Sequence, residues 1–327
     1  MTTKIMFSPK FPKPIFEVAV EMTPPGFELV AVDATGPQFL EVAREAEYFM
    51  GFGRNPLSTD FYTAARKMKL VQLISAGYNT LDLEAARKAR VPIANNGGAN
   101  SVAVAEHAVM LILATLKKLA WQHKNCVEGK WRIGDFAETR LYELESKTVG
   151  IVGLGNIGKK VARRLHGFDV RIVYYDILRL PEHEEDALGV RFVLLDELLK
   201  TADVVTLHVP LSAQTKNMIS EHQLNLMKPT AVLVNTCRGP VVDELALHKA
   251  LITRRIAGAG LDVMVDEPPS RDNPLLNVDT ITITPHTAGP TWENWTKAFR
   301  NGFDNILRVA AGRPPQWVIP ELREPTR

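Results

Sequence analysis

Short apolar runs alternate with helical patterns along almost the whole chain. In the first hundred residues, five apolar runs bounded by chain-breaking residues predict strands at 5–7, 28–32, 48–52, 70–74 and 92–94. Helical patterns such as 39–45 and 82–90 lie between them. This alternation predicts a small α/β unit with a parallel sheet.

A second series of strand patterns begins after Lys147. Apolar, β-branched runs recur at 148–152, 170–175, 204–208, 231–235, 258–262 and 280–284, with helical segments between them. Continuous apolar runs are typical of strands that are buried on both faces. Six such strands predict a doubly wound parallel sheet of the Rossmann type.

Two longer helical patterns lie on either side of this second series. Residues 101–119 are apolar on nearly every side and begin at a plausible Ser101 cap, which predicts a buried helix. A final helix is expected over 292–311, beyond the last strand. We therefore expect an α/β protein of two domains: 101–292, and a smaller flavodoxin-like domain of 1–100 and 293–327 that is discontinuous in sequence.

Composition and charge exclude several kinds of partner. The net charge of +2 over 327 residues gives no electrostatic reason to expect nucleic acid as a partner. Cys126 and Cys237 have no metal-ligand spacing and cannot form a disulfide framework, which favours a cytoplasmic protein without a metal site. Residues 102–116 contain Glu106 and His107, both interpreted as structural, and are too few to span a membrane. The acidic run 182–186 is expected to be a solvated surface segment.

A glycine-rich hexad, Gly153-x-Gly155-x-x-Gly158, follows the strand predicted at 148–152 and precedes a predicted helix. That context is typical of a dinucleotide-binding turn. Gly153 permits the tight turn, Gly155 lets a pyrophosphate approach the backbone, and Gly158 lets the helix pack close to the strand. The helix N-terminus would supply N–H groups and partial positive charge.

Asp176 ends the next predicted strand, 18 residues after Gly158 (176 − 158 = 18). A carboxylate near this spacing accepts hydrogen bonds from the adenosine ribose and repels a 2′-phosphate, so NAD is favoured over NADP. Arg179 keeps NADP open, because an arginine is what a 2′-phosphate site uses. The alternative is that Asp176 merely ends a strand in a turn.

Three further side chains follow later strands: Arg238, Glu267 and His286. Arginine can hold a carboxylate and a keto oxygen with forked donors, and histidine can exchange a proton near neutral pH. A glutamate beside the histidine would stabilise the imidazolium. Structural roles are the alternatives: an ion-pair arginine, a strand-end histidine, and Asp266 in place of Glu267.

The chain resembles the D-isomer-specific 2-hydroxyacid dehydrogenase family over nearly its whole length. Besides the segments above, the matching motifs lie at 75–82, 99–107, 147–158 and 208–211. The resemblance implies an NAD-dependent enzyme that transfers a hydride between NAD(H) and a small 2-hydroxy or 2-keto acid, with D stereospecificity. It makes 101–292 the NAD-binding domain and 1–100 with 293–327 the substrate domain. It also implies a homodimer, to which residues 121–144 would contribute.

The resemblance also implies residue roles. Arg238 would bind and polarise the substrate, His286 would protonate the keto oxygen, and Glu267, which the following Pro268 selects over Asp266, would pair with His286. Backbone N–H groups of Ala76 and Gly77 would hold the substrate carboxylate, with Asn100 nearby. The remaining cofactor positions are Asn156 and Ile157 at the pyrophosphate, Asp262 at the carboxamide, and Pro210, Thr215, Thr236 and Cys237 along the dinucleotide.

Some features depart from the family pattern or leave the function open. Glu267 stands where the formate-dehydrogenase branch has glutamine, which argues against formate. Trp292 either walls an apolar substrate pocket or packs, with Trp295, on the other domain; Phe52 and Arg54 are further pocket candidates. Two alternative functions are a dinucleotide-sensing scaffold of the corepressor type and another dehydrogenase chemistry, such as phosphite oxidation.

Overall fold

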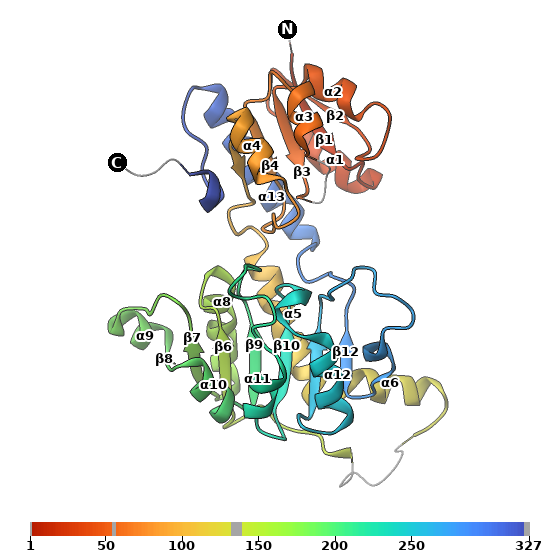
Figure 1. The fold of residues 1–327 in the computed structure, drawn as a ribbon, viewed down its shortest axis with the longest axis vertical. Helices are drawn as coiled ribbons and strands as arrows, with labels where there is room; N and C mark the ends of the chain where they lie inside the picture. The colour runs from red at the N-terminus through yellow and green to blue at the C-terminus, as the bar shows by residue number, and fades with distance from the viewer. Residues whose placement is uncertain (1, 54–56, 132–138, 324–327) are drawn as a thin grey trace. The chain divides into compact units, whose positions relative to one another are not determined.

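The computed structural model describes residues 2–53, 57–131 and 139–323. It divides into two compact units (Figure 1). Unit 1 comprises residues 1–100 and 290–327, and unit 2 comprises residues 101–289. The chain returns to unit 1 at Pro290, and Thr291 caps the final helix by accepting the N–H of Asn294.

Unit 1 is built on a five-stranded parallel sheet. Its strands, in the spatial order β2-β1-β3-β4-β5, are Phe27–Ala31, Thr3–Ser8, Tyr48–Gly51, Leu70–Leu73 and Ile93–Ala94. All five strands predicted from the apolar runs are present. All are short, and β3, β4 and β5 are buried along their whole length, as strands covered on both faces are.

Helices cover both faces of this sheet. The helices α2 (Phe39–Glu45), α3 (Thr59–Ala64) and α4 (Leu83–Ala89) pack with Met6, Phe49 and Val71 on one face. The helices α1 (Lys13–Glu21) and α13 (Trp292–Ala310) pack with Ile5, Phe7 and Met50 on the other. The long helix α13 therefore packs in unit 1, and a short 3₁₀ turn, η4 (Pro320–Leu322), follows it.

Unit 2 is built on a seven-stranded parallel sheet in the order β12-β11-β10-β9-β6-β7-β8. In chain order the strands are β6 Thr148–Val152, β7 Arg171–Tyr175, β8 Val190–Phe192, β9 Val204–Leu207, β10 Val232–Asn235, β11 Gly258–Leu261 and β12 Ile281–Ile283. Six of them match the predicted runs. The edge strand β8 was missed because its three residues carry too short a pattern, with Arg191 exposed at its centre.

Strand residues of unit 2 alternate between two cores. Val152, Val205 and Leu233 face α10 (Leu195–Thr201), α11 (Glu221–Leu226) and α12 (Glu244–Ile252). Ile151, Val204 and Val234 face α5 (Ser101–Leu116) and α8 (Asn156–Leu165). Figure 1 shows α11 and α12 in front of the sheet. The remaining elements are α6 Leu119–Val127, α9 Glu182–Leu188, η1 His166–Phe168, η2 Gly239–Val241 and η3 Pro274–Asn277.

Two local predictions need correction. The helix expected over 101–119 ends at Leu116, since Lys118 adopts a left-handed conformation with φ of 50° and a separate helix follows. The acidic run 182–186 is not wholly solvated, because Glu185 is only 1% exposed. Buried carboxylates require partners, and those of Glu185 are described below. No helix among the described residues is long and apolar enough to cross a membrane.

Candidate active site

The carboxyl ends of β10, β11 and β12 bring three loops to one edge of the unit 2 sheet. The strands are parallel neighbours, with Asn235 opposite Leu261 and Leu261 opposite Ile283. Arg238, Glu267 and His286 lie in the loops that leave these strand ends. In open α/β sheets this edge is where ligands bind.

His286 and Glu267 form a hydrogen-bonded pair. Nδ1 of His286 lies 2.6 Å from Oε2 of Glu267, and the side chains are 35% and 22% exposed. The other carboxylate oxygen of Glu267 accepts the N–H of Met264 at 3.2 Å. The glutamate is thus oriented by its own loop, and it in turn orients the imidazole.

Arg238 is half-buried in the loop after β10. The buried side chain of Asn235 shapes this loop: its Nδ2 donates to the carbonyl of Arg238 at 2.9 Å, and its Oδ1 accepts the N–H of Cys237 at 3.0 Å. The next residue, Gly239, packs directly on the loop after β11, since a Cβ there would lie 2.0 Å from the carbonyl carbon of Met264. The Arg238 loop and the Glu267 loop are therefore in contact.

Asp262, at the end of β11, is 1% exposed and organises the loop that carries His286. Its Oδ1 accepts the N–H of Thr287 at 2.9 Å, and its Oδ2 accepts the N–H of Ala288 at 2.9 Å. Its carbonyl accepts the N–H of His286 at 2.8 Å, where the backbone has a φ of +55°. The carboxylate thus lies within a network of the protein's own donors, and its expected role at the carboxamide stays a prediction.

His107 on α5 completes this network, a contact that the sequence interpretation missed. Thr284 donates its hydroxyl proton to Oδ1 of Asp262 at 2.6 Å, so the 2.8 Å contact between the same hydroxyl and Nε2 of His107 requires an Nε2–H donor. Nε2 also lies 3.3 Å from Oδ1 of Asp262. Burial acts to raise the pKa of Asp262, but the bonds from His107, Thr284 and the backbone hold that pKa below its ordinary value.

The glycine-rich turn has the geometry that a dinucleotide needs. Gly153 has a φ of +93°, and a Cβ on Gly158 would lie 2.2 Å from the carbonyl oxygen of Gly153, so both glycines are required by the turn itself. A Cβ on Gly155 would meet no atom within 4 Å. Packing does not explain Gly155, whereas close approach of a ligand does. Gly155 also caps α8, whose first amides, at Asn156, Ile157 and Gly158, precede the first intrahelical donor, Lys159.

Asp176 lies half-buried directly after β7 and closes this turn. Its Oδ2 accepts the N–H of Leu154 at 2.7 Å, and its Oδ1 accepts the N–H of Leu178 at 3.1 Å. The carboxylate is therefore placed between the glycine turn and the loop after β7. Ile177 and Leu178 are both exposed beside it.

The other residues expected along the dinucleotide lie at the ends of β9 and β10. Thr215 donates to the carbonyl of Pro210 at 2.6 Å, which closes the loop after β9. Within the described part of the chain, Oγ1 of Thr236 and Nδ1 of His208 are buried without a hydrogen-bond partner. Buried polar atoms are ordinarily paired, so this neighbouring pair suits a polar ligand. Burial raises the pKa of Cys237 to about 11, which keeps it a thiol at neutral pH.

In unit 1, two of the residues expected to bind substrate, Ala76 and Gly77, lie in the loop after β4, and Asn100 follows β5. Ala76 and Gly77 are half-buried, and Ser75 donates to the carbonyl of Gly77 at 3.0 Å. Oδ1 of Asn100 is buried without a partner in the described residues. Trp295 packs within unit 1, 5.6 Å from the ring of Phe11 and 6.3 Å from that of Phe52, whereas Trp292 is exposed. Arg54 lies outside the described residues.

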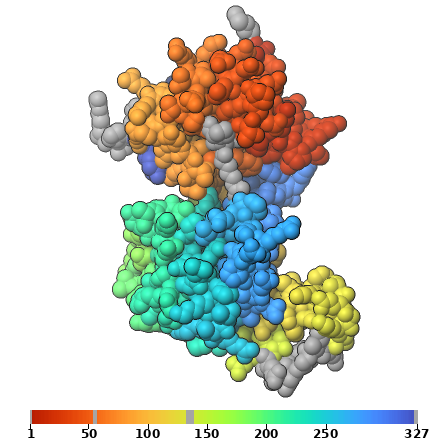
Figure 2. Space-filling view, turned by 45° about the vertical axis from the view of Figure 1, so that its right-hand side comes forward, coloured from red at the N-terminus to blue at the C-terminus, as the bar shows by residue number. Residues whose placement is uncertain are grey.

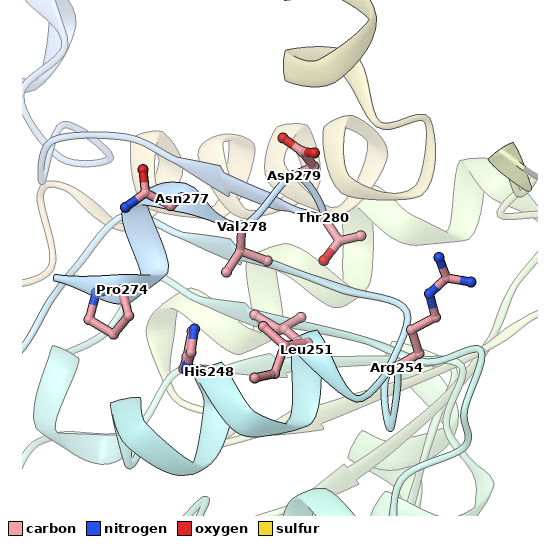
Figure 3. Close-up of a pocket in the computed structure, with 9 residues that line it drawn as sticks. His248, Leu251, Arg254, Pro274, Asn277, Val278, Asp279 and Thr280 are labelled. Carbon is pink, nitrogen blue, oxygen red and sulfur yellow. The ribbon is translucent and has the colours of Figure 1, made fainter. Parts of the chain in front are cut away.

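A pocket of about 430 Å³ lies elsewhere on unit 2 (Figure 3). Its lining includes His248, Leu251, Arg254, Asp279 and Thr280. Thr280 directly precedes β12, so this pocket is at the amino ends of the strands. It is therefore separate from the edge that carries Arg238, Glu267 and His286.

Comparison with known proteins matches residues 109–288 to the model of the D-isomer specific 2-hydroxyacid dehydrogenase NAD binding domain. A glyoxylate reductase of Korarchaeum cryptofilum is 37% identical over 86% of both chains. A D-3-phosphoglycerate dehydrogenase of Archaeoglobus fulgidus is 34% identical over 94% of this chain and 58% of its own length. A solved glyoxylate reductase from Paecilomyes thermophila has a TM-score of 0.85 at 27% identity, over 98% of this chain and 99% of its own.

The comparison agrees with the fold and with the resemblance seen in the sequence. The chain, with one parallel sheet in each unit, has the two-unit α/β architecture of these dehydrogenases. The matched region falls within unit 2, which contains the glycine-rich turn and all three candidate catalytic side chains. The chain belongs to the D-isomer specific 2-hydroxyacid dehydrogenase family and is an oxidoreductase of the CH–OH group of 2-hydroxy acids.

Proposed function

We propose that this protein is an NADH-dependent reductase of small 2-keto acids that forms D-2-hydroxy acids, and that Arg238, Glu267 and His286 are its catalytic residues. The observation that carries the proposal is the 2.6 Å contact between Nδ1 of His286 and Oε2 of Glu267. A histidine held in this way by a carboxylate is suited to exchange a proton with a keto oxygen.

His286 acts as the general acid in reduction. Since Glu267 engages Nδ1, the proton given to the keto oxygen leaves from Nε2. Glu267 stabilises the imidazolium before transfer, and it keeps the neutral ring in the Nδ1–H form afterwards. In the oxidative direction the same nitrogen takes the proton from the hydroxyl group.

Arg238 binds and polarises the substrate. Its guanidinium offers a fixed fork of donors that fits a carboxylate next to a keto oxygen. The Arg238 loop packs on the Glu267 loop through Gly239 and Met264. Movement of one loop would therefore displace the other. A bound nicotinamide supplies the hydride in reduction and accepts it in oxidation.

The residues of unit 2 favour NAD over NADP. The carboxylate of Asp176 lies beside the glycine turn, which supports a role as the ligand of the adenosine ribose. Its negative charge would repel a 2′-phosphate. The cofactor roles of Asn156, Ile157, Pro210, Thr215, Thr236, Cys237 and Asp262, and the substrate roles of Ala76, Gly77 and Asn100, are part of the same proposal.

The direct test is turnover of a panel of keto acids, with glyoxylate, pyruvate, hydroxypyruvate and phenylpyruvate each offered with NADH and with NADPH. Oxidation of NADH is followed by its absorbance, and the hydroxy acid formed is analysed on a chiral column. We expect reduction of at least one keto acid with NADH to the D product. Binding of NADH without turnover of any keto acid would instead favour a dinucleotide-sensing scaffold.

We further propose a homodimer in the cytoplasm. Helix α6, which overlaps the segment 121–144 expected to contribute to a dimer, has no buried residue, and Figure 2 shows this yellow helix standing out from the rest of its unit. Leu119, Val127 and Trp131 expose apolar surface along it, as a surface that is covered by a second copy would. Light scattering of the purified protein tests the dimer.

The unpaired state of Cys126 and Cys237 is consistent with a reducing compartment.

A further inference from the structure

The buried carboxylate of Glu185 has no role in the chemistry described so far. It lies on α9 and is 1% exposed, although it is part of an acidic run at the surface. Burying a carboxylate costs free energy unless the charge is paired and hydrogen-bonded. Its partners therefore indicate what it does.

Glu185 pairs with Arg179, the arginine that follows Asp176 by three residues. Nε of Arg179 donates to Oε1 of Glu185 at 2.9 Å. The guanidinium carbon lies 5.5 Å from the ring centroid of Phe192 on β8, which adds a cation–π contact. The hydrogen bond from Arg179 is the main cause that holds the pKa of Glu185 below its ordinary value, so the carboxylate is ionised at neutral pH.

A second set of contacts ties the same carboxylate to the loop after β7. The hydroxyl of Tyr174 donates to Oε1 of Glu185 at 2.9 Å and accepts the N–H of Leu180 at 2.8 Å. Asp176 fixes the start of this loop through the N–H of Leu178. Arg179 therefore lies in a loop that is held at both ends, with its charge offset by Glu185.

This arrangement bears on the 2′ position of the adenosine ribose. An arginine just after the acid that binds the ribose can serve as a ligand of a 2′-phosphate, so the sequence alone leaves NADP as an alternative cofactor. Two carboxylates and one guanidinium, from Asp176, Glu185 and Arg179, leave one net negative charge there. A dianionic phosphate ester is disfavoured by that charge, whereas a ribose hydroxyl is not.

We propose that Glu185 is a specificity-determining residue that keeps Arg179 from serving as a 2′-phosphate ligand and so secures the preference for NAD(H). The inference rests on the proposed NADH-dependent function. It differs from the role of Asp176, which acts on the ribose directly, because Glu185 acts through the charge and position of Arg179.

The test is equilibrium binding of NADH and NADPH by titration calorimetry, which needs no turnover. Glu185→Gln keeps the size and an acceptor oxygen but removes the charge. It is expected to tighten NADPH binding about ten-fold, the value of one charge-assisted contact, and to change NADH binding less than about two-fold. Adding Arg179→Gln to this variant should abolish the gain.

Asp186→Asn is the matched control, because it removes a charge from the same helix in a pair with Arg191 at 2.8 Å. It should leave the affinity for NADPH unchanged. Tyr174→Phe removes the hydrogen bond that Tyr174 donates to Glu185 without altering charge, so it should lower the melting temperature without tightening NADPH binding.

Three results would overturn the proposal. The first is unchanged NADPH affinity in folded Glu185→Gln. The second, which holds even if that variant misfolds, is a large loss of NADPH binding in the single variant Arg179→Gln, because Arg179 would then already contact the phosphate. The third is a wild-type protein that binds NADPH as tightly as NADH, and this result alone also refutes the proposed cofactor preference.

Discussion

Nδ1 of His286 lies 2.6 Å from Oε2 of Glu267, and Oε1 of the same carboxylate is held by the N–H of Met264. The imidazole is therefore oriented by a group that is itself fixed. Charge and geometry at this pair should both affect proton transfer.

Replacing Glu267 by glutamine should preserve the hydrogen bond but remove the charge that stabilises the imidazolium. We expect kcat for keto-acid reduction at pH 7.5 to fall about ten- to hundred-fold, and the alkaline limb of the pH–rate profile to move to lower pH. Asp266→Asn, at the exposed neighbouring position, is the control and should leave both unchanged. An unaltered profile in Glu267→Gln would refute the proposed role.

Arg238→Lys should separate charge from geometry. Lysine keeps the positive charge but cannot offer two parallel donors, so kcat/KM for keto acids should fall about 100-fold, and Arg238→Ala should lower it further. The dissociation constant of NADH, measured by fluorescence, should stay within about two-fold. If Arg238→Lys retained full kcat/KM, bidentate substrate binding would be wrong.

Asp176→Ala should relax the cofactor preference. Removing this carboxylate abolishes the repulsion of a 2′-phosphate and the acceptor for the ribose, so the ratio of kcat/KM with NADPH to that with NADH should rise about ten-fold. The loss of the bonds to Leu154 and Leu178 also predicts a lower melting temperature. A constant cofactor ratio would contradict the ribose assignment.

His107 should act as a positioning residue for the His286 loop. His107→Leu removes the donor to Thr284 and Asp262, and we expect kcat to fall about ten-fold while NADH binding is kept. His107→Gln can restore an N–H donor and should recover part of the activity. If both variants lowered only the melting temperature, with kcat and its pH profile intact, the contact would be structural alone.

Cys237 should be unreactive in the folded protein. The raised pKa of Cys237, about 11, leaves it protonated from pH 7 to 9. In Cys126→Ser no thiol should therefore react with a thiol reagent until the protein is unfolded. Rapid labelling of Cys237 in the folded variant at pH 8 would show that it is reactive.

The fold could be predicted closely because its signals are local. Apolar runs of three to six residues mark β1, β3, β4 and most strands of unit 2, because a strand buried on both faces is apolar at most positions. Strand β8 was not predicted, because its three residues, the central one exposed, form no such apolar run. The glycine-rich turn was also readable, because its spacing reflects contacts within one strand–turn–helix unit.

The sequence could suggest candidate residues for the site, but not the hydrogen bonds that connect them to the rest of the protein. Arg238, Glu267 and His286 follow three strands, and parallel strands deliver such residues to one edge. His107 could not be recognised, because its partner Thr284 is 177 residues away and nothing near His107 in the sequence signals the contact.

The sequence by itself determined the two parallel sheets and the glycine-rich turn, both of which depend on short spacings, and it named Arg238, Glu267 and His286 as catalytic candidates. Only the tertiary structure decided that Asp262 faces inward to hold the His286 loop, and that Glu185 leaves the acidic surface run to pair with Arg179. The physical reason is that burial and pairing of a charge depend on which surfaces meet when the chain folds. The residues next to a carboxylate in a polar run do not indicate which side chain it will pair with in the folded protein.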